Sequence, residues 1–407
     1  MSDGWQRARL GEVTRQVRER HVPNATTRYR LLGVRGKGLG AFEREDLLGS
    51  QTKAVALTPV RQGQFIYNRL FAGTGSFGVI TPDLDGAWVS SEFPLFDVDT
   101  GRVDVGYLRL VFQQPAVWDL VAAACVGTTG SRMRWHERKF AEFEIDLPPL
   151  AEQRRIVDLI AVTDGQVRAA EDATRAAERA LGAHLDATFA ELEDCPMRMM
   201  GSLVSAGSGP SWAASDEVPT PTEGSTPVIG ITSTPAGTRL VDVAQRRHVV
   251  GLSAKVRTLT QGSLVMIRTN GNRDRIGNVY RVPEAAVGHA FSAFQIGLSV
   301  NDAEDTPYLF WFLSAPSTQA RISDAASGST GLGNVAVSWL NRLDVPWPTD
   351  SIRHRVTIIA DALDATSLAA HAVASRAARL RAALVPHLLS AGHHIPESYD
   401  RFLDTVA

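Results

Sequence analysis

The 407-residue sequence has few of the residues that mark special classes of protein. Its two cysteines, Cys125 and Cys195, are too few for a disulfide framework and lack the spacing of zinc ligands. The absence of a run of about 18 apolar residues argues against a membrane span, and the N-terminus lacks the apolar core of a signal peptide. Because 44% of the residues are hydrophobic, the chain is not disordered. We therefore expect a cytoplasmic protein of two or three domains, with no metal site and no membrane span.

Net charge is also nearly absent, at −2, which taken alone argues against a nucleic-acid partner. The charges are unevenly placed, however. Residues 151–195 carry 5 basic and 10 acidic residues, and residues 196–349 carry 12 and 11. Only four of the 42 basic residues are lysines. The planar guanidinium of arginine is better suited than the lysine ammonium to donate two hydrogen bonds to a phosphate or a guanine edge. Near-neutrality of the whole chain therefore does not exclude a nucleic-acid partner.

The sequence does contain an internal repeat with a shift of about 200 residues. The matched pairs include Leu32-Gly33-Val34 with Ile229-Gly230-Ile231, Gln62-Gly63 with Gln261-Gly262, Arg69 with Arg268, Gly78 with Gly277, Phe93 with Phe294, Tyr107-Leu108 with Tyr308-Leu309, and Phe140 with Leu340. Since the order is preserved, residues 1–149 and 196–349 are each predicted to form a mixed α+β domain. A duplication usually yields two similar binding surfaces, although a copy kept for stability alone would leave the same pattern.

Each copy is followed by a segment with a helical pattern, residues 150–195 and 350–392, in which apolar and small residues recur four and three apart. In the first segment these are Ile156, Ile160, Thr163, Val167, Ala170, Thr174, Ala177, Leu181, His184 and Thr188. In the second they are Val356, Ile359, Leu363, Thr366, Ala370, Val373, Ala377, Leu380, Leu384 and His387. The heptads predict two helices of about 60 Å that pair as an antiparallel coiled coil and hold the domains at opposite ends, with residues 393–407 as a tail. Alternatively, each helix buries its seam on its own domain.

The sequence matches known enzyme motifs only in part, so the evidence for catalysis is weaker than the evidence for the repeat and the two helices. The segment Gly36–Gly40 lacks the spacing and the Lys-Ser/Thr ending of a P-loop. Glu137-Arg138-Lys139, with Asp119 upstream, has the Glu-x-Lys form of many metal-dependent nucleases, which need carboxylates that converge on a cation. One alternative is therefore a nuclease that uses Glu137 and Lys139. Another is a coiled-coil scaffold whose domains bind only proteins.

Polar loops rich in arginine and glycine occur at equivalent places in both copies. Arginine can bridge O6 and N7 of guanine, asparagine can pair with adenine, and serine or threonine can bond phosphates. The candidate DNA-binding residues of the first copy are Lys37, Arg69, Thr74, Ser76, Thr129, Ser131, Arg132 and Arg134. Those of the second copy are Arg268, Asn270, Asn272, Arg273, Arg275, Ser329, Thr330 and Asn334. Any one of them alone could belong to a solvated turn, but their recurrence in both copies predicts DNA binding.

Two adjoining segments make the sequence resemble a known family. Gly127-Thr-Thr-Gly-Ser-Arg132, followed by Ile145-Asp-Leu-Pro-Pro-Leu-Ala-Glu-Gln-Arg-Arg-Ile-Val157, resembles the specificity (S) subunit of type I restriction–modification systems. The similarity covers essentially the whole chain, including its two-copy layout. The sequence departs from the pattern at Gln64 and Ser263, where an Asp commonly follows the glycine. It also departs in the second copy, where the Leu-Pro-Pro-Leu-x-Glu-Gln signature is reduced to Pro346-Trp-Pro-Thr-Asp-Ser-Ile-Arg-His-Arg-Val356.

The resemblance implies that residues 1–149 and 196–349 are target-recognition domains, each of which reads one half of a bipartite target in double-stranded DNA. It implies that the helices set the gap and dock two methyltransferase (M) subunits, with restriction (R) subunits joining the complex. The predicted partner-binding residues are Glu152, Gln153, Arg154 and Arg155. The chain itself would be non-catalytic and bind no cofactor. S-adenosylmethionine for adenine N6 methylation, and ATP and magnesium for translocation and cleavage, would bind to the partners.

Overall fold

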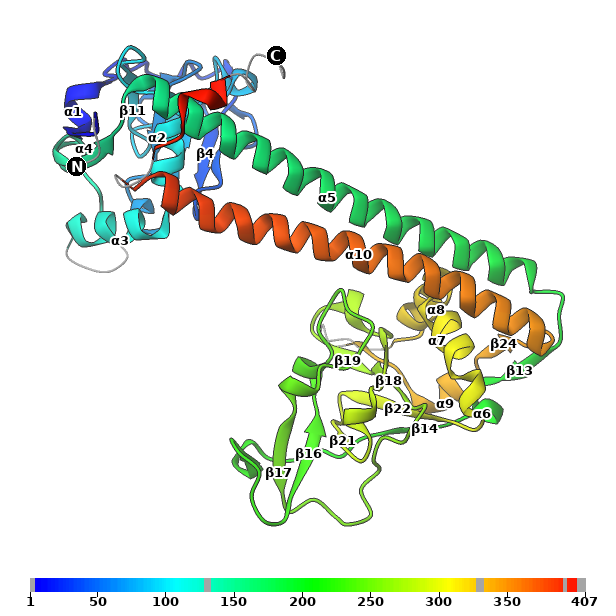
Figure 1. The fold of residues 1–407 in the computed structure, drawn as a ribbon. Helices are drawn as coiled ribbons and strands as arrows, with labels where there is room; N and C mark the ends of the chain where they lie inside the picture. Colours follow the sequence, from blue (N-terminus) through cyan, green and yellow to red (C-terminus); the bar gives the residue numbers. More distant parts are fainter. Residues whose placement is uncertain (1–3, 128–132, 327–332, 391–393, 401–407) are drawn as a thin grey trace. The chain divides into compact units, whose positions relative to one another are not determined.

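The computed structural model of the chain describes residues 4–127, 133–326, 333–390 and 394–400. The chain forms two compact units (Figure 1), Met1–Ala170 with Val373–Ala407, and Glu171–Ala372. Both units mix helices with sheets, and each contains part of the two long helices α5 (Leu150–Glu191) and α10 (Asp350–Leu388). The predicted mixed fold with two long helices is confirmed.

The first unit is built around a four-stranded antiparallel sheet with the strand order β2-β11-β8-β9. The strands of this unit are β1 (Gln6–Arg9), β2 (Thr14–Gln16), β3 (Arg28–Tyr29), β4 (Leu32–Arg35), β5 (Gly40–Glu43), β6 (Leu47–Leu48), β7 (Leu57–Pro59), β8 (Phe65–Tyr67), β9 (Phe77–Val79), β10 (Trp88–Ser90), β11 (Leu95–Val98) and β12 (Glu144–Leu147). Its shorter helices are α1 (Leu10–Val13), α2 (Val105–Phe112), α3 (Pro115–Ala124) and α4 (Glu137–Glu142). Strand β1 pairs with β12, so the two ends of the first copy meet.

Alternation along β8 divides the apolar residues of the first unit between two cores. Phe65 and Tyr67 pack into an aromatic core that also contains Phe96 of β11 and Phe140 of α4, and the ring centroids of Phe96 and Phe140 are 3.9 Å apart. Ile66 faces the opposite side and joins a separate apolar cluster. Because both faces of β8 are buried, the sheet is fixed beneath the loops at its strand ends.

The second unit has the corresponding sheet, with the order β14-β22-β18-β20, and a second sheet with the order β15-β17-β16-β21. The strands are β13 (Met197–Met199), β14 (Val204–Ser208), β15 (Glu217–Val218), β16 (Ser225–Ile229), β17 (Arg247–Val250), β18 (Leu264–Ile267), β19 (Thr269–Asn270), β20 (Val279–Arg281), β21 (Ala290–Phe291), β22 (Gln295–Val300), β23 (Gly333–Asn334) and β24 (Asp344–Pro346). The shorter helices are α6 (Met200–Leu203), α7 (Thr306–Ser314), α8 (Pro316–Ala325) and α9 (Val337–Asn341). Strand β18 alternates as β8 does, with Leu264 and Met266 in one core and Val265 and Ile267 in another.

The two copies repeat each other down to single hydrogen bonds. The Tyr107 hydroxyl donates to the carbonyl of Asp146 at 2.7 Å, and the Tyr308 hydroxyl donates to the carbonyl of Pro346 at the same distance. Pairing of β1 with β12 in the first copy corresponds to pairing of β13 with β24 in the second. The repeat in the sequence therefore corresponds to a repeated architecture.

Helix α5 packs against α10 within each unit, the first half of one helix against the second half of the other. In the first unit Arg381 of α10 pairs with Asp164 of α5, and Ile160 shares a core with Val385. In the second unit Leu185 of α5 and Val356 of α10 lie in one core. The long helices thus bury part of their seams on each other and part on the domains.

The buried face of α5 departs from the predicted heptads at its C-terminal end. After Leu181 the buried positions are Leu185 and Phe189, and the predicted His184 and Thr188 are only partly buried. Leu181, Leu185 and Phe189 are spaced by four residues and lie in the core of the second unit. The spacing follows the 3.6-residue period of a helix that packs on a globular core, rather than the 3.5-residue period of a coiled coil.

The predicted seam of α10 is wrong at several positions. Ile359, Val373 and Leu380 are exposed. The buried positions of α10 are Val356, Ala360, Asp364, Ser367, Ala374, Val385 and Leu388. Small residues and an ion-paired aspartate form much of this seam, so the most apolar stripe of the helix is not the buried one.

Helix α10 is also long and apolar enough to cross a membrane, by length and composition only. The sequence criterion of an uninterrupted apolar run overlooks it, because polar residues interrupt the stretch. One such helix is weak evidence for a span. Its Asp361 and Asp364 form ion pairs with Arg281 and Arg239, each at 2.6 Å. We therefore interpret α10 as a helix packed within a protein.

Candidate nucleic-acid interface

Arg69 follows strand β8 and is held by a carboxylate from the start of α4. Its Nη2 donates to Oε1 of Glu137, and Gln16 Nε2 donates to the same oxygen at 3.3 Å. The two side chains are 18% and 21% exposed. Partial burial works to raise the pKa of Glu137, but the hydrogen bond and charge of Arg69 outweigh it, so the pKa lies below its ordinary value. The predicted reader Arg69 is therefore a largely buried guanidinium whose charge is already compensated.

Arg134 is the second predicted arginine of the first copy, and it also faces an acid. Its Nε lies 3.4 Å from Oε2 of Glu92, and both groups are partly exposed. Its main chain exchanges two 3.0 Å hydrogen bonds with Val126, which fixes the base of the loop between them. Arg134 is thus positioned near the surface, but its charge is partly offset.

The other described candidates of the first copy differ in exposure. Lys37 and Thr74 are exposed, and the Lys37 N–H donates to the Thr74 carbonyl at 2.9 Å. Lys37 has a φ of 57°, in the left-handed region, which marks a tight turn. Ser76 is buried, and its hydroxyl donates to the Val34 carbonyl at 3.0 Å. Ser76 therefore stabilises the fold and lies below the surface.

Five predicted residues lie outside the described part of the chain: Thr129, Ser131, Arg132, Ser329 and Thr330. Asn334, which follows the second gap, is exposed and pairs with Thr269 between β23 and β19.

Arg268 occupies the place in the second copy that Arg69 occupies in the first. The Arg69 carbonyl accepts the Trp135 N–H at 3.0 Å, and the Arg268 carbonyl accepts the Val335 N–H at 3.0 Å. No ion pair of Arg268 occurs among the residues that the structure describes. With the repeat shift of 200 residues, the position that matches Glu137 is Val337, which has no charge. Two equivalent arginines thus differ in whether a carboxylate compensates their charge, within the described part of the chain.

The loop after Arg268 is shaped by its own asparagines. Asn270 Oδ1 accepts the Asn272 N–H at 2.9 Å, and Asn272 Oδ1 accepts the Asp274 N–H at 3.0 Å. Arg273 is exposed, with Nη2 at 3.4 Å from the Ser323 carbonyl. This loop can present side-chain amides and a guanidinium to base edges or phosphates.

Arg275 has a different role from its neighbours in the loop. Its Nη2 donates to the Thr234 carbonyl and lies 3.4 Å from the Tyr280 hydroxyl. The Tyr280 hydroxyl in turn donates to the Pro235 carbonyl at 3.1 Å. Arg275 therefore ties the loop to the body of the domain.

The predicted nuclease pair is not assembled as a catalytic site. Glu137 is occupied by Arg69, and Lys139 Nζ lies 3.2 Å from Oε2 of Glu142 on the same helix. Within the described ranges no group of three or more His, Cys, Asp or Glu residues could hold a metal ion. These contacts leave the nuclease alternative without the converging carboxylates that it needs.

Three of the four predicted partner-binding residues at the start of α5 are buried within the first unit. Gln153 is fully buried; its Oε1 accepts the Asp104 N–H at 2.8 Å, and its Nε2 donates to the Pro148 and Arg102 carbonyls. A side-chain amide is suited to this position because it can donate and accept at once. Of the four predicted residues, only Arg154 is exposed.

Glu152 and Arg155 bind the C-terminal segment of the chain, within the same unit. Glu152 is 3% exposed and accepts the Ile395 N–H at 2.7 Å. The Arg155 guanidinium bonds both carboxylate oxygens of Asp400 at 2.7 Å. The predicted tail is therefore ordered from residue 394 to residue 400 and covers the start of α5.

The reduced signature of the second copy keeps the same contact with another residue. Arg353 stands where the first copy has Gln153, and its Nη1 donates to the Pro348 carbonyl at 2.8 Å, as Gln153 does to Pro148. Its Nη2 pairs with Asp305 at 2.9 Å. The second copy therefore lacks the Glu-Gln pair but keeps the hydrogen bond between the first turn of the helix and its domain.

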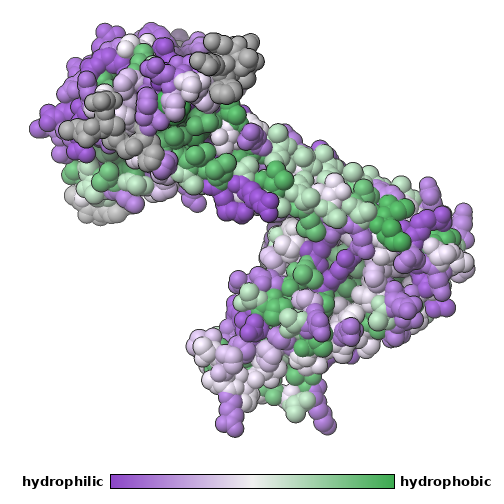
Figure 2. Space-filling view, in the orientation of Figure 1, coloured by the Kyte–Doolittle hydropathy of each residue, from purple (hydrophilic) through white to green (hydrophobic). Residues whose placement is uncertain are grey.

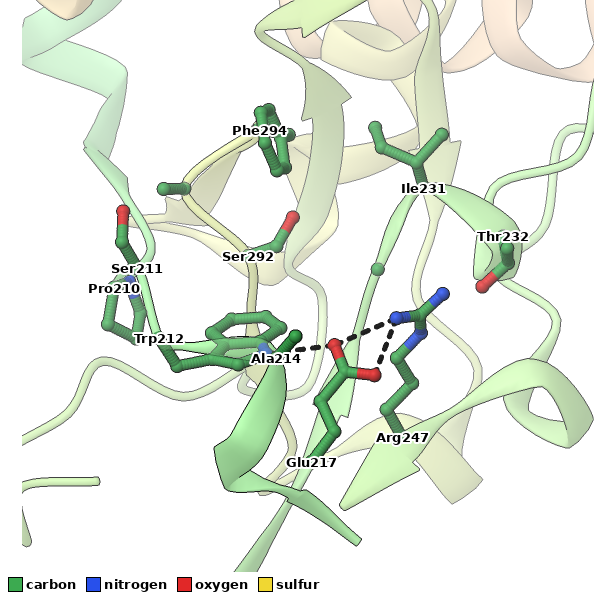
Figure 3. Close-up of a pocket in the computed structure, with 12 residues that line it drawn as sticks. Pro210, Ser211, Trp212, Ala214, Glu217, Ile231, Thr232, Arg247, Ser292 and Phe294 are labelled. Carbon is green, nitrogen blue, oxygen red and sulfur yellow. Dashed lines mark hydrogen bonds and ion pairs between the residues drawn. The ribbon is translucent and has the colours of Figure 1, made fainter. Parts of the chain in front are cut away.

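A pocket of the second unit was not anticipated from the sequence. It has a volume of about 350 Å³ and lies between the segment after β14, the end of β16 and the start of β22. Figure 3 shows Trp212 and Phe294 on one side and Ile231, Thr232 and Arg247 across from them. The available signal was an aromatic residue in a segment, residues 209–224, that has no match in the first copy.

Comparison with known proteins gives a likeness in structure only. No protein-family model and no curated protein matches the chain. A chain from a structure of the assembly and conformational transition of the type I restriction–modification system matches with a TM-score of 0.62 and 18% identity, over 97% of this chain and 99% of that one. The S subunit from M. genitalium matches with a TM-score of 0.51 and 12% identity, over 97% and 98%. The HsdS subunit from Thermoanaerobacter tengcongensis matches with a TM-score of 0.48 and 17% identity, over 97% and 98%. Over nearly its whole length, the chain therefore has the fold of type I restriction–modification specificity subunits.

Proposed function

We propose that the chain is a non-catalytic DNA specificity subunit of a type I restriction–modification complex. The observation that carries this proposal is the likeness to the type I system chain, at a TM-score of 0.62, over nearly the full length of both chains. The duplicated domains, each with an arginine at the end of its central strand, support two readers for a bipartite target. A cytoplasmic location follows from this function.

The reading surfaces are proposed from the exposed polar residues of both copies. In the second domain these include Asn272, Arg273 and Asn334. In the first domain they include Lys37 and Thr74, with Arg134 at the edge of a loop. Since Arg69 and Arg134 are paired with acids, the first domain would gain less from phosphate contacts than the second. Base contacts would then carry most of the specificity of the first domain.

The long helices are proposed to dock the partners. Helix α10 exposes Ile358, Ile359, Leu368, Val373 and Leu380. Hydrophobic surface is visible over the long helices in Figure 2. Exposed apolar patches of this kind mark protein interfaces. Two methyltransferase subunits would bind there and restriction subunits would join them, with S-adenosylmethionine, ATP and magnesium on those partners.

The test is selection of duplexes from a random pool by the chain assembled with its methyltransferase subunits. Enrichment of a motif in two parts with a fixed gap is expected. A complex that retains every duplex equally at low salt, or none, would contradict the proposal. Metal-dependent cleavage by the chain alone, lost in Glu137→Ala, would favour the nuclease instead, and partner binding without DNA binding would favour the scaffold.

A further inference from the structure

The pocket of the second unit presents aromatic rings to solvent beside residues 268–275, the loop that we propose meets DNA (the reading loop). The inference about this pocket rests on the proposed function. Phe294 is 57% exposed, whereas most of the chain's large aromatic side chains are buried in its cores. Trp212 is half-buried, packed against the apolar cluster that contains Val228 and Val249. An exposed phenyl ring in a pocket of about 350 Å³ offers a flat apolar surface to a ligand.

The main chain joins this pocket to the reading loop. The Phe294 carbonyl accepts the Arg268 N–H at 2.9 Å and the Thr269 N–H at 3.3 Å. Residues that line the pocket are therefore fixed directly against residues proposed to meet DNA. A ligand that reaches the loop can also reach the pocket.

The polar side of the pocket is a fixed guanidinium. Arg247 Nη1 donates to both carboxylate oxygens of Glu217, at 2.7 and 2.6 Å, and Trp212 Nε1 donates to Glu217 Oε1 at 3.0 Å (Figure 3). The hydrogen bonds from Trp212 and Arg247 hold the pKa of Glu217 below its ordinary value, so the pair stays ionised. Across the described residues, no hydrogen-bond partner is found for Nε and Nη2 of Arg247. Two donors in a plane match the O6 and N7 acceptors of guanine.

We propose that this pocket binds an unpaired nucleobase of the DNA, guanine in preference to the others, with the ring stacked on the exposed Phe294 and the O6/N7 edge toward Arg247. Stacking on aromatic side chains is available to any base, and the guanidinium adds the preference. Trp212 and Glu217 are not among the matched pairs of the repeat, so we expect the pocket to act on one half of the target only.

The test compares two duplexes of one sequence, fully paired or with a single extrahelical base, bound to the chain in complex with its methyltransferase subunits. The duplex with an extrahelical guanine is expected to bind about tenfold more tightly than the paired one. Phe294→Ala should abolish the difference and Phe294→Tyr should keep it. Arg247→Gln should remove the preference for guanine over the other extrahelical bases.

The matched control is Leu240→Ala, because Leu240 is similarly exposed, at 52%, in the same unit but outside the pocket. This substitution should change neither the affinity for the paired duplex nor the affinity for the duplex with an extrahelical base. Thermal unfolding of the Phe294 variants should be unaltered, since the ring is exposed, so any loss would report on binding.

Two outcomes would overturn the inference. Equal affinity of the unaltered complex for both duplexes would show that the pocket takes no base, while enrichment of a two-part motif would still support the proposed function. Weaker methyltransferase binding in Phe294→Ala, with DNA binding unchanged, would assign the pocket to a protein partner. Failure to bind any duplex would instead count against the proposed function itself.

Discussion

At the scale of single residues, equivalent positions of the repeat carry different electrostatics. Arg69 and Arg268 end equivalent strands and accept equivalent main-chain hydrogen bonds, yet among the residues that the structure describes only Arg69 has a carboxylate partner. The difference comes from one substitution in the repeat, Glu137 in the first copy and Val337 in the second. The two domains are therefore similar in fold but unequal in the charge that they can offer to DNA.

Glu137→Gln is predicted to destabilise the first unit by about 1–3 kcal/mol near pH 7, because a largely buried guanidinium loses its charged acceptor. The pKa of Glu137 is lower in the folded chain than its ordinary value of 4.5, so the folded state binds fewer protons. The stabilisation is therefore present above about pH 4.5 and is lost as the pH falls through the folded pKa. Urea unfolding of the first unit at pH 7 and at pH 3.5 measures both effects.

Glu142→Gln is the matched control, since Glu142 pairs with Arg138 and Lys139 at the surface of the same helix. It should change the free energy of unfolding little at pH 7. Equal effects of the two substitutions on the free energy of unfolding would show that the Arg69–Glu137 pair stabilises the first unit no more than a surface ion pair does.

At the scale of elements, the first turn of each long helix is joined to its own domain by a buried or partly buried side chain. Gln153 bonds the Pro148 carbonyl in the first copy, and Arg353 bonds the Pro348 carbonyl in the second. Asp104 and Asp305 stand at matched positions and meet these two side chains. The two motifs therefore differ in sequence, but both attach the long helix to the domain that precedes it.

Gln153→Ala is predicted to lower the stability of the first unit by about 1–3 kcal/mol, because one buried and two partly buried main-chain groups lose their hydrogen-bond partner. Arg154→Ala, at the exposed neighbour, should change stability by about 0.5 kcal/mol or less. Binding of the methyltransferase subunit should be weakened by Arg154→Ala, because Arg154 is the exposed one of the four predicted partner-binding residues. Denaturant unfolding and a binding assay with both variants measure the two effects separately.

The helices also show what the sequence can and cannot predict about packing. The length of both helices and their mutual packing follow from the scarcity of Pro and Gly, with Pro386 only in the last turn of α10, and from the sustained period. The buried face of α10 does not, because Ala360, Asp364 and Ser367 are buried while Ile359 and Leu380 are exposed. The hydropathy of the sequence therefore does not identify which face of the helix is buried against the other helix.

At the scale of the whole molecule, the chain contains two units with separate cores. Phe65 belongs to a core of the first unit and Trp311 to a core of the second. Such a chain is not expected to unfold in one all-or-none step. Phe65→Ala should cost the first unit about 3–5 kcal/mol.

Hydrogen exchange of the main-chain amides measures this prediction. Protection of β8 should fall in Phe65→Ala while protection of β18 in the second unit stays unchanged. A parallel loss of protection in both strands would mean that the units unfold as one.

The equivalence of positions in the two copies was more predictable from sequence than the contacts that their side chains make. Repeated loops identified Arg69 and Arg268 as equivalent, but pairing of Arg69 with Glu137 joins residues 68 positions apart and leaves no local signal. Ser76 shares the loop composition of its neighbours, yet it is buried. Trp212 and Arg247 form the pocket with Phe294 only because separate strands bring them together.

The central claim is that each domain reads its own half of a bipartite target, and selection of duplexes by single-arginine variants tests it most directly. The complex with Arg273→Ala should enrich a motif that is relaxed in one half only, and the complex with Arg134→Ala a motif relaxed in the other half. Each lost base contact should cost about 1–3 kcal/mol of discrimination at its position. If either variant weakened binding to all sequences equally, or if both altered the same half, the division of reading between the domains would be contradicted.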